Sequence, residues 1–136
     1  MKLEVVVDGQ GLPLGTVVAP AHVAETNLAE PVLEDVPIPL PQNVPVLADK
    51  GYDCDPLRDR LSRRGVRLLS PHRKGRQQAS RNDGRRMKRY RRRFIIERTN
   101  AWLHCFRRLA HRWEYYTFMY VGFVRIACVL LAFARL

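Results

Sequence analysis

Residues 44–70, which read VPVLADKGYDCDPLRDRLSRRGVRLLS, decide the fold of this chain. Residues 44–48 form a short apolar run, typical of a buried strand, that ends at Asp49. A helical segment over residues 55–64 follows, and residues 66–70 are again apolar. The order strand, helix, strand predicts an α/β fold.

Residue types at both ends of the predicted helix support its bounds. Asp55 is a suitable N-cap, and Pro56 would then occupy the first helical position, where its missing N–H costs nothing. Gly65 is a suitable helix stop after Arg64. We therefore expect the helix to lie between the two strands.

Turn and breaker signals divide the region before this unit. Residues 3–7 and 12–19 are rich in β-branched side chains and are joined by the sequence DGQG at residues 8–11, which predicts a β-hairpin. Residues 22–35 indicate a loop and a short helix. Four prolines make residues 36–45 an extended connector.

Helical periodicity dominates the C-terminal half. Residues 71–86 are polar and basic and are expected to form a mobile loop. A long helix is predicted over residues 87–112 and an apolar helix over residues 116–135. The second could span a bilayer by length, but Arg125 near its middle favours a helix that covers the sheet. We expect residues 1–136 to form a single domain.

Charge is distributed unevenly along the 136 residues, whose net charge is +11. Residues 1–57 carry two lysines against nine acids, whereas residues 58–112 carry twenty Lys and Arg against three acids. A block this basic attracts polyanions, because phosphate neutralisation releases counterions. The hydrophobic content of 46% excludes disorder of the whole chain. Nucleic acid is the expected partner, with non-specific basicity or a membrane-surface role as the alternatives.

Cysteine usage favours a reducing compartment. Cys54, Cys105 and Cys128 form no CxxC pair, which argues against a disulfide scaffold or a structural zinc site. Cys105 and Cys128 lie in apolar helical contexts and are expected to be buried. The first residues carry no apolar run of a signal peptide. A cytoplasmic location is therefore expected.

One face of the predicted long helix carries polar residues in a narrow stripe. At 100° per residue, Tyr90, Arg93, Glu97 and His104 fall within about 60° of one another. A second stripe should pack against the protein and comprises Ile95, Trp102, Phe106, Leu109 and Trp113. The polar stripe is either an ordinary Arg–Glu ion pair on a solvated face or part of a functional site.

Asp49 adds a second carboxylate that bears on this choice. It follows a strand at the edge where open α/β sheets place their sites. Asp49 and Glu97 together could bind divalent cations through oxygen ligands and support phosphodiester chemistry. Asp is also a common turn residue at such a junction, so both interpretations of Asp49 stay open.

Several motifs in order resemble bacterial insertion-sequence transposases of the DDE class. The segment LADKGYD at residues 47–53 looks like the sequence around their second catalytic aspartate. The spacing Tyr90-x2-Arg93-x3-Glu97 is similar to their Y-x2-R-x3-E-x6-K signature. VDGQGLPL at residues 7–14 resembles the hairpin after their first catalytic strand, and ERTNAWL and FRRL, beginning at residues 97 and 106, resemble their C-terminal block.

The resemblance implies an incomplete RNase H-like catalytic domain with long C-terminal helices, using Mg²⁺ or Mn²⁺ for DNA cleavage and strand transfer. In it, Asp49 is the second metal-binding carboxylate and Glu97 is the third. Tyr90 and Arg93 position DNA or the catalytic helix. Further DNA contacts are expected from His104, Arg91 and Arg92.

Two departures from the family pattern bear on activity. His104 stands where the signature has lysine, and histidine is largely neutral at pH 7. The family's first aspartate lies on a strand upstream of the hairpin, where this chain begins, and Asp8 belongs to the hairpin turn. We therefore expect a C-terminal portion of a transposase, from a truncated gene copy or a second reading frame, that is inactive alone.

The expected partners follow from this reading. They are the terminal inverted repeats, the target DNA, an upstream transposase segment and a second copy of the chain, at the nucleoid in the cytoplasm and with no membrane. One alternative is a catalytically dead DNA-binding remnant that occupies element ends. Another is a basic RNA-binding protein that depends on neither Asp49 nor Glu97.

Overall fold

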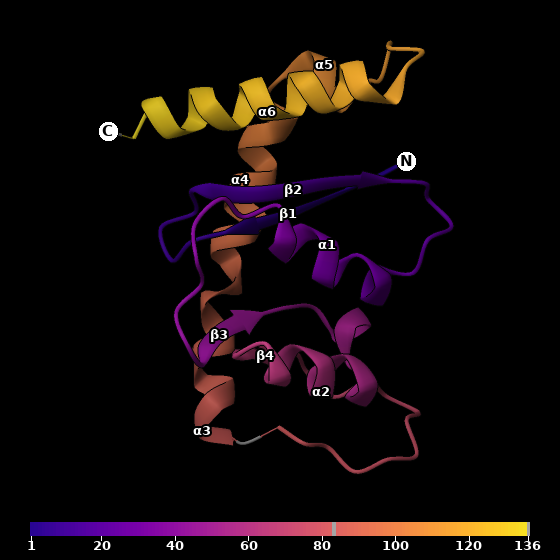
Figure 1. Cartoon of the computed structure of the whole chain (residues 1–136), viewed down its shortest axis with the longest axis vertical. Helices are drawn as coiled ribbons and strands as arrows, with labels where there is room; N and C mark the ends of the chain where they lie inside the picture. Colours follow the sequence, from indigo (N-terminus) through magenta and orange to yellow (C-terminus); the bar gives the residue numbers. More distant parts are fainter. Residues whose placement is uncertain (83, 136) are drawn as a thin grey trace.

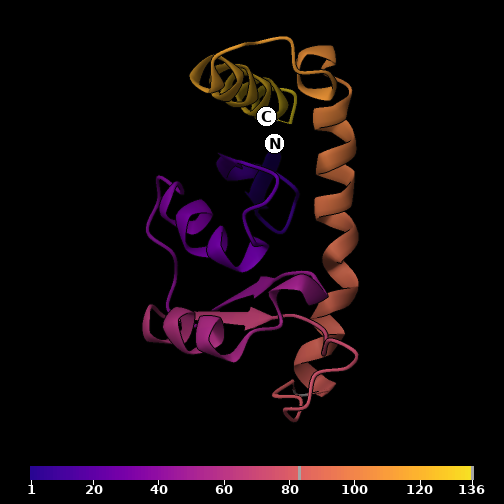
Figure 2. The same ribbon diagram turned by 90° about the vertical axis from the view of Figure 1, so that its right-hand side faces the viewer.

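The computed structural model of the chain describes residues 1–82 and 84–135. Two separate two-stranded sheets and several helices form a mixed α/β fold (Figure 1). A column of consecutive helical segments runs alongside both sheets, as Figure 2 shows. The α/β prediction is confirmed at this level.

The N-terminal hairpin folds as its turn sequence predicts. Strands β1 (Lys2–Val7) and β2 (Pro13–Ala19) pair in antiparallel fashion. The Asp8 carboxylate accepts hydrogen bonds at 2.8 Å from the backbone N–H groups of Gln10 and Leu12. Asp8 therefore holds the turn, in agreement with its exclusion from the site.

Short helices connect the hairpin to the second sheet. A 3₁₀ helix η1 (Glu25–Asn27) leads into α1 (Ala29–Glu34). Pro31 lies in the first turn of α1, where helical N–H groups lack intrahelical partners in any case. Residues 36–43 carry no helix or strand, as their prolines predict.

The strand–helix–strand unit forms the second sheet. Strands β3 (Val44–Leu47) and β4 (Val66–Leu69) are parallel. Parallel neighbours need a crossover connection, which α2 (Asp55–Arg63) provides. Gly65 has a φ of +76°, a left-handed conformation that glycine adopts without steric cost.

The predicted N-cap of α2 is wrong by one residue. Cys54 is the N-cap, because its carbonyl accepts the first helical hydrogen bond, from the N–H of Arg58, at 3.0 Å. The Asp55 carboxylate pairs with Arg76 instead of capping the helix. Pro56 still lies in the first turn, where it is tolerated.

The continuous helix predicted over residues 87–112 is also wrong. The chain forms α3 (Gly84–Met87), a 3₁₀ segment η3 (Lys88–Arg93), α4 (Phe94–His104) and α5 (Arg107–Ala110). Seven cations lie between residues 85 and 93. Like charges one helical turn apart destabilise an α-helix, so this stretch lacks the support that a regular helix needs.

Two apolar cores hold the elements together. The first lies between α1, α2 and the β3–β4 sheet and contains Ala29, Leu33, Leu57, Leu61, Val66 and Leu68. The second lies between the hairpin, the C-terminal part of the column and α6 (Thr117–Phe133) and contains Leu103, Leu109, Tyr120, Val124 and Ala127. The helical column contacts both sheets and so sets how they lie relative to each other.

The packed face of α4 differs from the predicted stripe. Ile95, Thr99 and Leu103 are buried, whereas Trp102 is only half-buried. Trp113 is 78% exposed, so its predicted core position is wrong. The helix ends at His104, and the periodicity that begins at Ile95 therefore does not extend to Trp113.

Helix α6 covers the hairpin, as predicted, and lies across its outer side in Figure 1. Tyr120, Val124 and Ala127 form its buried face. No helix in the described ranges is long and apolar enough to cross a membrane.

The cysteines are unpaired, and one of them departs from expectation. Cys105 is exposed, because it follows the end of α4 and lies away from the packed face. Cys128 is half-buried, and this burial raises the pKa of its thiol. The expected burial is therefore wrong for Cys105.

Candidate active site

Asp49 lies directly after β3 and begins a short turn. It is the N-cap of the 3₁₀ helix η2 (Lys50–Tyr52), and its Oδ1 accepts a hydrogen bond from the N–H of Lys50 at 2.6 Å. Asp49 is therefore a turn residue. Its side chain is nevertheless 46% exposed, so the carboxylate remains accessible to other ligands.

Arg93 brings Asp49 together with the polar face of the helical column. Its Nη1 lies 3.4 Å from Oδ1 of Asp49, and its Nη2 lies 3.5 Å from Oε1 of Glu97. The same Nη1 donates a hydrogen bond to the hydroxyl of Tyr90 at 2.8 Å. Four of the predicted site residues thus meet around one guanidinium group.

The local helix type explains this convergence. In a 3₁₀ helix, side chains three residues apart lie above one another, and Tyr90 and Arg93 both belong to η3. Glu97 follows Arg93 by four residues, which is one turn of the α-helix that begins at Phe94. The contact between η3 and β3 then places Asp49 beside them.

The contacts of Arg93 with the two carboxylates are loose. Distances of 3.4 and 3.5 Å exceed the range of about 2.7–2.9 Å for strong charge-assisted hydrogen bonds. The hydrogen bond with Tyr90 raises the pKa of Arg93, partial burial lowers it, and Asp49 raises it again, for a net increase. Arg93 is therefore always charged, and both carboxylates can accept additional ligands.

The donor set around Arg93 fits a hard divalent cation only in part. Within the described ranges, no three His, Cys, Asp or Glu side chains are grouped so that they could bind a metal ion. Mg²⁺ commonly binds to one or two carboxylates and keeps several waters. Asp49 and Glu97, the latter 62% exposed, match this two-carboxylate pattern.

The other predicted DNA-binding residues lie along the same column. Arg91 and Arg92 are exposed on η3. His104 is exposed at the end of α4, roughly 10 Å along the helix axis from Glu97. We use the term basic ridge for the exposed cations of α3 and η3, which are Arg85, Arg86, Lys88, Arg89, Arg91 and Arg92.

Comparison with known proteins identifies the family. Residues 1–132 match the family model described as "Transposase DDE domain". The chain belongs to the DDE transposase family. The chain is 30% identical over 142 residues to a Burkholderia cepacia protein named "Putative transposase for insertion sequence element IS402". The resemblance to insertion-sequence transposases is thus confirmed.

The chain spans only part of that relative. The alignment covers 99% of this chain and 64% of the curated relative, so more than a third of the relative has no counterpart here. No solved structure matches the chain.

Asp53 forms a buried ionic cluster that the sequence did not reveal. Its side chain is 1% exposed and lies 2.5 Å from Arg58 and 2.7 Å from Arg76. The N–H of Arg73 donates to the same carboxylate at 2.8 Å. Burial alone would raise the pKa of Asp53, but these three donors lower it to about 2.

This cluster ties the basic segment to α2. Arg58 also donates to Ser70, at 2.8 Å to its hydroxyl, and to Asn82 at 3.3 Å. Arg81 pairs with Asp59 of α2 at 2.9 Å. Residues 71–82 thus have several defined contacts with α2 and with Asp53. The mobility predicted for residues 71–86 stays a prediction, and residue 83 lies outside the described ranges.

Tyr52, which lies between Asp49 and Asp53, links the turn after β3 to the hairpin. The hydroxyl of Tyr52, in η2, donates to Oε2 of Glu4 on β1 at 2.8 Å. Burial and the nearby Glu4 raise the pKa of Tyr52, so its hydroxyl stays protonated and remains a donor. The link holds the Asp49 turn against the hairpin.

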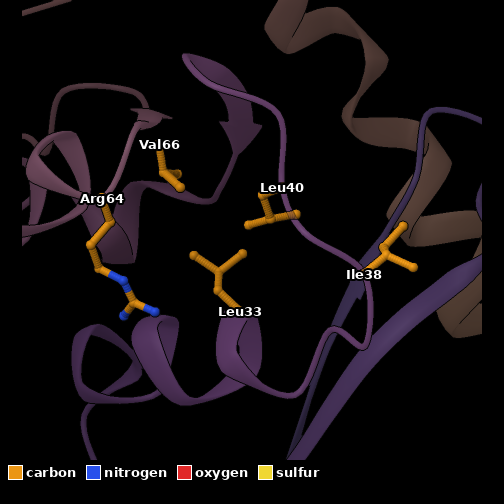
Figure 3. A pocket seen from close by; sticks show the side chains of 5 residues that line it. All are labelled: Leu33, Ile38, Leu40, Arg64 and Val66. Atoms are coloured by element: carbon orange, nitrogen blue, oxygen red, sulfur yellow. The ribbon is translucent and has the colours of Figure 1, made fainter.

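Two pockets of the surface have neither Asp49 nor Glu97 in their lining. A pocket of about 220 Å³ opens at the edge of the first core (Figure 3). Its lining consists of Leu33, Ile38, Leu40, Arg64 and Val66. A second pocket, of about 590 Å³, lies over the Asp53 cluster and includes Arg73 and Arg76. The candidate site is therefore an open surface between η2 and the helical column.

Proposed function

We propose that this chain supplies two metal-binding carboxylates, Asp49 and Glu97, to an RNase H-like transposase domain that cleaves and joins DNA. The observation that carries the proposal is the position of Arg93, which contacts both carboxylates although they are 48 residues apart in the sequence. An ordinary i,i+4 ion pair would involve Glu97 alone. Membership of the DDE transposase family supports this assignment.

Each side chain has a distinct part in this proposal. Asp49 and Glu97 would hold Mg²⁺ or Mn²⁺, which supplies Lewis-acid stabilisation of the charge that develops on a phosphodiester. Tyr90 fixes the orientation of Arg93 through its hydroxyl. Arg93 neutralises the carboxylates and, once these are occupied, is available to a DNA phosphate.

DNA is the proposed partner, bound along the basic ridge. Arg91 and Arg92 of the ridge, and His104 further along the column, would contact phosphates of the element ends and of the target. Phosphate contacts of this kind position DNA without reading its sequence and weaken as salt rises. The proposed place of action is the nucleoid in the cytoplasm.

We infer that the catalytic domain is completed by residues outside this sequence. In the described structure β1 pairs only with β2 and β3 pairs only with β4, so each sheet has an open edge. A further strand could pair with such an edge and bring a third carboxylate to the site. This chain alone is therefore expected to have little or no activity.

Metal binding tests the assignment of the two carboxylates. We expect Mn²⁺ titrated into the 136-residue chain to bind weakly, as followed by electron paramagnetic resonance, and we expect Asp49→Asn and Glu97→Gln each to abolish the binding. Glu34→Gln is the matched control, because Glu34 is 61% exposed and pairs with an arginine as Glu97 does. Equal binding by all variants would contradict the proposal.

Strand transfer tests the inference of incompleteness. Labelled DNA carrying the terminal inverted repeats of the element is incubated with the chain and Mg²⁺ or Mn²⁺. We expect no more than trace joining. Robust joining that Glu97→Gln abolishes would support the carboxylate roles and overturn the inference that the site is incomplete.

A second candidate function is a DNA-binding remnant that occupies element ends without catalysis. The basic ridge favours it, because exposed cations bind DNA whether or not the metal site is complete. This function predicts that a variant carrying both Asp49→Asn and Glu97→Gln still binds inverted-repeat DNA and still inhibits transposition by a complete transposase.

A further inference from the structure

The turn of the N-terminal hairpin contacts α4 at the two residues that follow Glu97. The hydroxyl of Thr99 donates to the carbonyl of Gly11 at 2.7 Å, and the guanidinium of Arg98 donates to the carbonyl of Gln10 at 2.9 Å. Thr99 is completely buried. Each of these hydrogen bonds joins residues that are 88 positions apart, so together they set how α4 lies against the hairpin.

The internal hydrogen bonds of the turn leave these two carbonyl groups to accept from the helix. The Asp8 carboxylate accepts from the N–H groups of Gln10 and Leu12. The N–H of Gly11 donates to the carbonyl of Asp8 at 3.1 Å. The turn therefore satisfies its own N–H groups and offers α4 a fixed pair of acceptors.

Gly11 leaves no room for a side chain at this junction. Its φ is +89°, which residues with a Cβ rarely adopt. A Cβ on Gly11 would lie 2.8 Å from Oγ1 of Thr99 and 3.3 Å from Cγ2 of Ile95. Gly9 of the same turn has no atom within 4 Å of the corresponding position. The close approach of turn and helix is thus made at Gly11 and not at Gly9.

Two arginines close the junction on its outer side. Nη1 of Arg135 donates to the carbonyl of Gln10 at 2.6 Å, which is the acceptor that Arg98 also uses. The two guanidinium groups lie 4.9 Å (Arg98) and 3.8 Å (Arg135) from the ring centroid of Trp102. Cation–π contacts of this kind are attractive, so the indole of α4 holds both cations beside the turn.

Strand β1 of the same hairpin holds the turn that carries Asp49. Glu4 on β1 accepts a hydrogen bond at 2.8 Å from the hydroxyl of Tyr52, which follows Asp49 by three residues. The hairpin therefore contacts both elements that present the candidate carboxylates. The direct link between the carboxylates through Arg93 is looser, at 3.4 and 3.5 Å.

We propose that the hairpin holds Glu97 at a set separation from Asp49, with Gly11 and Thr99 as positioning residues. The proposal rests on the metal-binding role proposed for the two carboxylates. Glu97 precedes Thr99 by two residues, so their side chains point about 200° apart around α4. Anchoring the buried side of the helix at Thr99 therefore fixes the direction in which Glu97 projects on the exposed side.

The geometry of a helix shows how precise this anchor has to be. A side-chain tip lies about 5–6 Å from the helix axis, so a rotation of α4 by about 20° moves the Glu97 carboxylate by roughly 2 Å. Functional groups have to be held within about 0.5 Å and 10–20° of their productive positions. Loss of the junction at Gly11 would therefore separate the carboxylates without unfolding the chain.

The separation of the two elements can be measured without metal. Lys50 and Ala101 are exposed, one next to Asp49 and the other one turn after Glu97. Nitroxide labels at Lys50→Cys and Ala101→Cys, with the native cysteines replaced by alanine, report the distance by double electron–electron resonance. We expect one narrow distance in this background.

Substitutions in the turn and in α4 should change that distance selectively. Gly11→Ala and Thr99→Val should broaden the distance distribution or shift it by about 2 Å. Gly9→Ala is the matched control in the same turn, and Thr99→Ser keeps the hydroxyl, so both should retain the narrow distance. Circular dichroism shows that each variant folds, and Thr99→Val decides the matter where Gly11→Ala does not fold.

Mn²⁺ binding then relates the separation to the site. Changes that misalign metal ligands commonly cost tenfold to hundredfold in affinity, so Gly11→Ala and Thr99→Val should each weaken Mn²⁺ binding roughly tenfold. Unchanged distances in both variants overturn the proposal, as does wild-type Mn²⁺ affinity in a variant whose distance has changed. A wild-type chain that binds no Mn²⁺ refutes the metal site instead, and the distances alone then decide whether the hairpin positions α4.

Discussion

Replacing Asp53 with asparagine should lower the free energy of unfolding by about 3 kcal/mol at pH 7. Arg58, Arg76 and the N–H of Arg73 donate to the Asp53 carboxylate and hold its pKa at about 2, against 3.8 for a free aspartate. That difference corresponds to about 2.4 kcal/mol in favour of the folded state. The neutral amide also leaves Arg58, which is 8% exposed, without its counter-ion.

The loss should depend on pH with a defined sign. The pKa of Asp53 is lower in the folded than in the unfolded chain, so its contribution is complete above the unfolded value. It is lost as pH falls from about 4 to below 2, because the carboxylate is fully protonated in both states only below its folded pKa of about 2. The difference in stability between wild type and Asp53→Asn should therefore be largest near pH 7 and small near pH 2.

Urea unfolding followed by circular dichroism at pH 7, 4 and 2.5 measures this difference. Asp59→Asn is the control, because Asp59 is 56% exposed and its pair with Arg81 should contribute at most about 1 kcal/mol. A double variant with Arg58→Met should recover part of the loss, since no buried charge then lacks a partner. A loss below about 0.5 kcal/mol at pH 7, or a loss independent of pH, would refute the reasoning.

Three further substitutions test other contacts. Thr99→Val should cost about 1–2 kcal/mol in urea unfolding, because the buried hydroxyl donates to the carbonyl of Gly11 at 2.7 Å. Tyr52→Phe removes the hydrogen bond to Glu4 and should cost about 1 kcal/mol in the same assay; an unchanged midpoint would contradict the link between the sheets. Arg93→Gln should strengthen Mn²⁺ binding roughly threefold to tenfold, since a competing cation between the two carboxylates is removed. A weakened Mn²⁺ signal in paramagnetic resonance would argue against that competition.

Elements set by local signals were predictable from the sequence. The Asp-Gly turn fixed the hairpin, because Asp8 satisfies two backbone N–H groups within its own turn. The residues that decide that turn lie within a few positions of one another. The strand–helix–strand order followed from two short apolar runs on either side of a helical segment, and the parallel pairing of the strands comes from the structure.

Elements that depend on distant contacts were not predictable. The helix predicted over residues 87–112 ran through part of the cationic stretch at residues 85–93, whose mutual repulsion accompanies a 3₁₀ segment. Trp113 fits an apolar stripe only if the helix continues to it, and the chain turns at Phe106, whose backbone is extended. Hydrophobic periodicity indicates which face of a helix packs against the protein. It does not indicate the residue at which tertiary contacts end the helix.

The candidate site was predicted in part. Helical spacing placed Tyr90, Arg93 and Glu97 on one face, and the resemblance added Asp49 from a separate element. The Asp53 cluster was missed because two of its three donors, Arg73 and Arg76, come from residues 71–82, a polar stretch without periodicity. One sequence feature could have indicated the cluster. Asp49, Asp53 and Asp55 lie within seven residues of one another, and a strongly basic segment follows them in the sequence.

Asp49 and Asp53 show how the number of donors separates a structural acid from a candidate catalytic one. Three tight donors surround the Asp53 carboxylate, which is 1% exposed, so an external ligand cannot reach it without breaking the cluster. Asp49 receives one close hydrogen bond, from the N–H of Lys50, and a loose contact from Arg93. Because the cluster holds one end of the loop rigid, the other end presents an accessible carboxylate at a fixed place opposite Glu97.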